Sequence, residues 1–114
     1  MLETLSLIHL QLPAEKPEEL ARWYADKMGF LRNGSFVSSG GTLIVFKQGR
    51  PLKNNKVHFG FRLSNKEAVL NWRKQLLSKK VVVAEMEGDA EYQAFRVYDP
   101  EGNEIEFFWQ DTLL

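Results

Sequence analysis

Apolar and polar residues alternate along several short stretches of the chain, and this alternation predicts β-strands with one buried face. The clearest stretch is residues 104–109, in which Glu104 and Glu106 alternate with three large apolar residues. Successive side chains of a strand point to opposite faces, so both glutamates share one face. Glu106 then lies among large apolar neighbours. A carboxylate in such a place is costly unless an arginine, a lysine or a metal ion pairs with it.

A tight turn is expected directly before this strand, in residues 99–103. Asp-Pro followed by Gly-Asn is typical of turns, because Pro100 fixes φ and Gly102 or Asn103 accepts a left-handed backbone at little cost. The chain therefore reverses here.

The remaining periodicity predicts two helices and further strands. One helix is expected over residues 17–28, with a proline and acids in its first turn and Gly29 as its stop. A capping box at residues 64–67 opens the other, which runs to about Ser78. Period-2 stretches predict strands at residues 5–12, 30–33, 35–38, 42–47, 57–63, 81–86, 93–98 and 104–109.

The order of these elements repeats once along the chain. His58 follows His9 by the same interval that separates Trp72 from Trp23, so the two halves align without gaps over their first strand and helix. We interpret this as two β-α-β-β-β modules, at about residues 4–48 and 56–110, within a single α+β domain of 114 residues. One helix covers only one sheet face, so two modules are expected to pair, within the chain or across a dimer.

Composition narrows the classes of function. Fifteen basic residues balance fifteen acidic ones, which disfavours nucleic-acid binding and attraction to an anionic membrane. The sequence has no cysteine, so disulfides, thiolate nucleophiles and iron–sulfur clusters are excluded. The first residues read neither as a signal peptide nor as a membrane span, and a cytoplasmic location is the expectation.

Three side chains are candidate metal ligands. His9 and His58 are the only histidines and occupy equivalent positions in the repeat, on the strand faces opposite the apolar rows, and Glu106 lies on the corresponding face of the last strand. Two imidazoles and a carboxylate suit Fe, Mn, Ni, Co or Zn as divalent ions and leave positions open for water and substrate. Val45 occupies the place of Glu106 in the first half and cannot bind a metal. The alternative is that the histidines are ordinary packed residues and the glutamate faces solvent.

Other polar and aromatic residues share the expected faces of these ligands. Arg62, Arg96 and Phe108 are candidates for substrate binding, although either arginine would also serve as a partner for Glu104 or as a solvated rim residue. The positions to test first for a general base are Gln11, Tyr98 and Glu104.

The motifs resemble those of the vicinal oxygen chelate superfamily, which includes glyoxalase I, extradiol dioxygenases, fosfomycin-resistance transferases and bleomycin-resistance proteins. His9 followed by Trp23-Tyr24 and Met28-Gly29-Phe30 is similar to its opening motif, and residues 98–106 are similar to its closing motif DPxGNxxE. The resemblance implies a cupped mixed sheet with helices on its outer face, a divalent metal that binds a small substrate through adjacent oxygens, and a homodimer in which His9 of one subunit shares a metal with His58 and Glu106 of the other.

Departures from the family pattern limit the activities that this resemblance implies. Val45 removes the fourth ligand of glyoxalase I, no basic residue follows Glu106 to hold a phosphonate, and no third histidine is present for the proton transfer of extradiol dioxygenases. The favoured hypothesis is a metal-dependent enzyme of lyase, isomerase, dioxygenase or transferase type, with the ligands His9, His58 and Glu106. The alternative is a protein of bleomycin-resistance type that sequesters a ligand without turnover.

Overall fold

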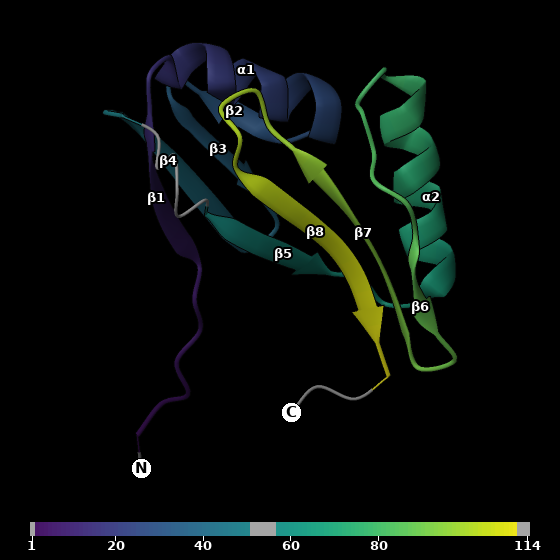
Figure 1. Ribbon diagram of the computed structural model, residues 1–114. Helices are drawn as coiled ribbons and strands as arrows, with labels where there is room; N and C mark the ends of the chain where they lie inside the picture. Colours follow the sequence, from purple (N-terminus) through teal and green to yellow (C-terminus); the bar gives the residue numbers. More distant parts are fainter. Residues whose placement is uncertain (1, 51–56, 112–114) are drawn as a thin grey trace. The chain divides into compact units, whose positions relative to one another are not determined.

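A computed structural model describes residues 2–50 and 57–111 of the chain. These residues form two compact units, one within residues 2–50 and the other within residues 57–111. Each unit contains four strands and one helix (Figure 1).

The first unit is a mixed four-stranded sheet with a helix on one face. Its elements are β1 (His9–Ala14), α1 (Pro17–Met28), β2 (Leu31–Asn33), β3 (Phe36–Ser39) and β4 (Thr42–Gln48). The strand order is β1-β4-β3-β2, in which β1 pairs with β4 in parallel and the other neighbours are antiparallel. Helix α1 packs against all four strands.

The second unit repeats this topology. Its elements are β5 (His58–Arg62), α2 (Lys66–Ser78), β6 (Glu87–Asp89), β7 (Tyr92–Tyr98) and β8 (Glu104–Gln110), and the strand order is β5-β8-β7-β6 (Figure 1). Strands β5 and β8 are parallel, as β1 and β4 are. The α+β class and the repeated β-α-β-β-β unit are therefore confirmed.

Each helix and its sheet enclose an apolar core on one side only. In the first unit this face includes Leu12, Ile44 and Phe46, all at most 2% exposed. In the second unit Phe107 stacks on Phe95 with 5.0 Å between ring centroids, and both are buried against α2. Since side chains alternate along a strand, the other face of each sheet carries the remaining side chains, including both histidines.

The helix ends follow their local sequence. Pro17 begins α1, where its missing N–H costs nothing, and Gly29 ends it in a left-handed conformation with φ 71°. The N-cap of α2 is Asn65, whose side chain accepts a hydrogen bond from the Ala68 amide at 2.8 Å. The helix therefore starts one residue later than a cap at Ser64 would give.

A buried carboxylate stabilises the turn between β7 and β8. Asp99, 4% exposed, accepts hydrogen bonds from the backbone amides of Glu101 and Asn103 with Oδ1, and from the Asn103 side chain with Oδ2. Gly102 adopts φ 86°, as its place in the turn predicts. This turn fixes the point at which β8 begins, two residues before Glu106.

Two strand predictions differ from the structure. Residues 5–8 precede β1, which instead continues through Pro13, because β1 lies at a sheet edge where a proline removes no ladder hydrogen bond. Residues 81–86 form no strand and contribute only a single bridge between Val83 and Val97. Val81 is buried at the end of α2, so its apolar character reflects packing against the helix, and the edge strand β6 follows at Glu87.

Candidate functional site

Strand register gathers polar side chains on the open face of the second sheet. Glu104 on the central strand β8 lies between His58 on β5 and Tyr98 on β7. In the next row of the same face, Glu106 lies between Gly60 and Arg96. The alternation predicted for residues 104–109 is confirmed, and it is what places both carboxylates on one face.

The first row forms a chain of three polar groups. His58 Nδ1 lies 2.8 Å from Glu104 Oε2, and the Tyr98 hydroxyl donates a hydrogen bond to Glu104 Oε1 at 2.7 Å. Each carboxylate oxygen of Glu104 therefore has its own partner. The hydrogen bond to the carboxylate raises the pKa of Tyr98, because ionisation of the phenol would place a second negative charge beside Glu104.

The second row holds Glu106 by one oxygen. Its Oε2 accepts a hydrogen bond from the Tyr92 hydroxyl at 3.2 Å and lies 3.5 Å from Arg96 Nε. Its Oε1 faces His58 Nε2 at 3.9 Å. The side chain of Glu106 is only 16% exposed, and a carboxylate in such a place needs a charged partner. In this structure that partner is Arg96.

Arg96 bridges two carboxylates on this face. Its Nη1 lies 3.5 Å from Glu87 Oε1, and Glu87 followed by Glu106 raises the pKa of the guanidinium. Burial, and then the nearby charge of Glu106, raises the pKa of Tyr92. Sequence reasoning missed Tyr92 and Glu87, because they lie just outside the predicted strands 93–98 and 81–86. Tyr92 has the same strand parity as Arg96 and Tyr98 along β7, and this shared parity was the signal that could have identified the tyrosine.

The spacing of His58 and Glu106 is close to that of two ligands of one divalent metal ion. Two ligand atoms bound to one such ion lie about 3.0–3.5 Å apart, given metal–ligand distances near 2.1 Å. The present 3.9 Å between His58 Nε2 and Glu106 Oε1 would need to shorten by less than about 1 Å. A histidine that binds a metal through one ring nitrogen commonly donates a hydrogen bond from the other to a carboxylate. Glu104 occupies that position beside His58 Nδ1.

The third predicted ligand belongs to the other unit. His9 lies on the open face of β1, opposite Leu43 of β4, and Gln11 is opposite Val45. Among residues 2–50 and 57–111, no group of three or more His, Asp or Glu side chains is arranged to hold a metal ion. The convergence of His9 with His58 and Glu106 therefore stays a prediction, as does a catalytic role for Gln11.

Two predicted substrate-binding residues lie beside the polar side chains of His58, Glu104 and Glu106. Arg62 lies on the open face of β5, two positions beyond Gly60, and its Nη2 donates a hydrogen bond to the Gln110 carbonyl at 3.0 Å. Phe108 covers Gly60, where an added Cβ would approach its ring to 3.2 Å. Their roles in binding a substrate remain predictions.

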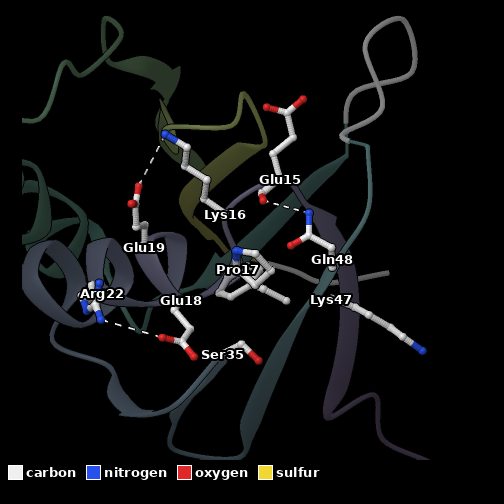
Figure 2. Close-up of a pocket in the computed structure, with 10 residues that line it drawn as sticks. Glu15, Lys16, Pro17, Glu18, Glu19, Arg22, Ser35, Lys47 and Gln48 are labelled. Atoms are coloured by element: carbon white, nitrogen blue, oxygen red, sulfur yellow. Dashed lines mark hydrogen bonds and ion pairs between the residues drawn. The ribbon is translucent and has the colours of Figure 1, made fainter.

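The first unit has a separate hollow of about 610 Å³ near the start of α1. Figure 2 shows that ion pairs line it, with Lys16 directed towards Glu19 and Arg22 towards Glu18, while Gln48 donates a hydrogen bond to the Glu15 carbonyl. None of the predicted site residues lines this hollow.

No helix in the described part of the chain is long and apolar enough to span a membrane.

A family model described as the Glyoxalase/Bleomycin resistance protein/Dioxygenase superfamily matches residues 6–107. No curated protein matches the chain by sequence.

Solved structures share this architecture at low sequence identity. Lactoylglutathione lyase from Agrobacterium tumefaciens is 18% identical with a TM-score of 0.75, over 91% of this chain and 92% of that chain. A glyoxalase/bleomycin resistance protein/dioxygenase from Alicyclobacillus acidocaldarius is 22% identical with a TM-score of 0.74, over 94% and 92%. A putative glyoxalase family protein from Bacillus anthracis is 21% identical with a TM-score of 0.71, over 96% and 99%. At these identities the likeness establishes the fold.

Proposed function

The chain belongs to the glyoxalase/bleomycin resistance protein/dioxygenase superfamily, and from that premise we propose that it is a metal-dependent enzyme acting on a small molecule with vicinal oxygens. His58 and Glu106 are proposed as metal ligands in the second unit, and His9 as the third. The proposed ion is divalent Mn, Fe, Ni, Co or Zn, the range that two imidazoles and a carboxylate suit.

One observation carries this proposal: His58 turns one ring nitrogen to a carboxylate and the other towards Glu106. Glu104 occupies Nδ1 at 2.8 Å, while Nε2 faces Glu106 Oε1 at 3.9 Å. Tyr92 and Arg96 hold the other oxygen of Glu106, so Oε1 is the oxygen directed at the imidazole.

The metal would act as a Lewis acid that polarises the substrate oxygens. The chain's own residues then have separate tasks. Phe108 supplies an apolar wall beside the ligands, and Arg96 places a positive charge on the same face, where it favours negative charge developing on a substrate. Both oxygens of Glu104 are engaged, which favours a structural task for it over the role of general base.

The site also requires a source for the third ligand. We propose a homodimer in which His9 of one subunit completes the site formed by His58 and Glu106 of the other. Mixing the His9→Ala and His58→Ala variants tests this directly. A shared site predicts that hybrid dimers regain one intact site of the two, although neither variant binds metal well alone. A site formed within one chain predicts no recovery on mixing.

Metal analysis tests the central claim. Protein purified without chelators or nickel affinity resin is expected to contain divalent metal near one equivalent per chain, and the metal-stripped protein is expected to bind added Mn(II) or Zn(II) in calorimetry. His58→Ala and Glu106→Gln should each weaken binding by at least about tenfold. Glu85→Gln, an exposed change outside the cluster, is the matched control and should bind as the wild type does.

The same preparation separates the enzyme from a sequestering protein. A wild-type protein that is isolated without metal and binds neither ion when it is added would contradict the proposal and favour ligand sequestration on the same fold. If metal binds, the loaded protein is screened with hemithioacetals of α-oxoaldehydes, epoxides and catechols to identify the reaction class.

A further inference from the structure

The two equivalent histidines have different neighbours in their sheets. His9 faces Leu43 in the register of β1 and β4, whereas His58 faces Glu104 in the corresponding register of β5 and β8. The strand order and the direction of pairing are the same in both units. The carboxylate beside His58 is therefore a feature of the second half alone.

We propose that Glu104 is a positioning residue that fixes the ring of His58 with its proton on Nδ1 and its lone pair on Nε2, facing Glu106. This inference rests on the proposed metal-binding function, because only the unprotonated nitrogen of an imidazole can bind a metal. Tyr98 supports Glu104 from the far side and keeps the carboxylate directed at the ring.

The two distances from the imidazole decide which nitrogen holds the proton. His58 Nδ1 is 2.8 Å from Glu104 Oε2, which is hydrogen-bond distance, whereas Nε2 is 3.9 Å from Glu106 Oε1, which is too long for a hydrogen bond. A neutral imidazole has one donor and one acceptor nitrogen, and the partner of one nitrogen sets the state of the other. The proton therefore belongs on Nδ1, and Nε2 is the acceptor.

The carboxylate is itself held in place. Tyr98 donates to Glu104 Oε1 at 2.7 Å, so Glu104 can turn only by breaking that hydrogen bond or its contact with His58. The side chain of Glu104 is 21% exposed, which limits competition by water. The pair of His58 and Glu106 is thus prepared for a metal before any ion arrives, while His9 receives no such orientation from Leu43.

The tautomer can be measured in metal-free protein, independently of any activity. Two-bond ¹H–¹⁵N spectra of the EDTA-treated chain at about pH 9, above the ordinary range of an imidazole, report which ring nitrogen is protonated. We expect His58 to be protonated on Nδ1 in the wild type. A wild-type spectrum with the proton of His58 on Nε2 overturns the inference, and this measurement needs no variant that must fold.

The matched variant is Glu104→Leu, which copies the His9–Leu43 pair that the fold already contains. Its fold is checked by circular dichroism. We expect the His58 signals to shift towards protonation on Nε2, while the His9 signals in the same spectrum stay unchanged and serve as the internal control. A His58 pattern that is identical in the wild type and the variant overturns the inference. Tyr98→Phe keeps the carboxylate and is expected to retain Nδ1 protonation.

Metal titration separates this inference from the proposed function. With Zn(II) as the probe, Glu104→Leu should weaken binding about 10–100-fold, the usual cost of losing such a partner, and Tyr98→Phe should weaken it less. If the wild type binds no metal, the proposed function fails and the tautomer measurement still decides the role of Glu104. If the variant binds as tightly as the wild type, the positioning role fails and the metal site stands.

Discussion

Arg96 Nε lies 3.5 Å from Glu106 Oε2, which places an arginine from the neighbouring strand against the proposed metal ligand. That Nε is buried and makes no hydrogen bond to any described residue, so the contact with Glu106 is electrostatic. A carboxylate that is only 16% exposed would be costly to keep ionised without a cation. Arg96 therefore serves as the positive partner of Glu106 when no metal is bound.

Arg96→Met is expected to make the metal-free protein less stable and more responsive to metal. The charge of Glu106 would then be uncompensated until an ion binds. The melting temperature should therefore fall by a few degrees without metal, and it should rise more on addition of Zn(II) than the melting temperature of the wild type does. Differential scanning calorimetry with and without the ion measures both changes.

Arg62→Met is the control for this experiment. Arg62 lies on the same open face but hydrogen-bonds a backbone carbonyl, so its loss should leave the metal-induced rise unchanged. Equal metal-induced rises in the wild type and Arg96→Met would show that Arg96 does not compensate the charge of Glu106.

The repeat made most of the fold predictable from sequence. Pro17 and Gly29 predicted the two ends of α1, and the alternation in residues 104–109 placed Glu104 and Glu106 on one face, as the structure has them. The strand predicted over residues 81–86 is absent: its β-branched residues favour a strand locally, whereas Val81 packs at the end of α2. Local pattern could not reveal that tertiary contact.

The sequence could predict which residues of the candidate site share a sheet face, but not which of them contact one another. Parity assigned His58, Glu106 and Tyr98 to one face, but it could not pair Arg96 with Glu106 or Glu104 with His58, because those pairs depend on the register between strands. Register is a property of two strands together. The sequence of either strand alone does not contain it.

Gly60→Ala is expected to disturb the apolar wall of the site. A Cβ at this position would lie 3.2 Å from the Phe108 ring and 3.3 Å from the Glu106 carbonyl oxygen, closer than ordinary van der Waals contact. The Phe108 ring must move, and overpacking of this kind costs about 1–2 kcal/mol of unfolding free energy. Urea unfolding measures the loss.

Gly41→Ala is the matched control for this change. Nothing lies within 4 Å of a Cβ added at Gly41, and its backbone does not need a positive φ. Its effect should stay within about 0.5 kcal/mol. A destabilisation of Gly60→Ala no larger than that of Gly41→Ala would argue against the close packing of Phe108 on β5.

Asp99→Ala is expected to be among the most destabilising changes in the second unit. The change removes a carboxylate that accepts three hydrogen bonds, two of them from the backbone amides of Glu101 and Asn103. Asp99 and Asn103 are buried, so water replaces these bonds poorly. We expect a loss of about 2–4 kcal/mol in urea unfolding. Asp111→Ala, at an exposed position just after β8, should change stability little, and similar losses in the two variants would refute the role given to Asp99.

Glu104→Leu should lower the pKa of Tyr98 towards its ordinary value of 10.0. In the wild type the hydrogen bond to Glu104, and then the charge of that carboxylate, raise the pKa, because both favour the protonated phenol. The stabilisation that this bond contributes is therefore complete below pH 10 and is lost as the pH rises through the higher pKa of the folded state. Phenolate absorbance, taken as the difference between each protein and its Tyr98→Phe counterpart, isolates this tyrosine from the other two. Ionisation of Tyr98 at the same pH with and without Glu104 would mean that the phenol is not held by that carboxylate.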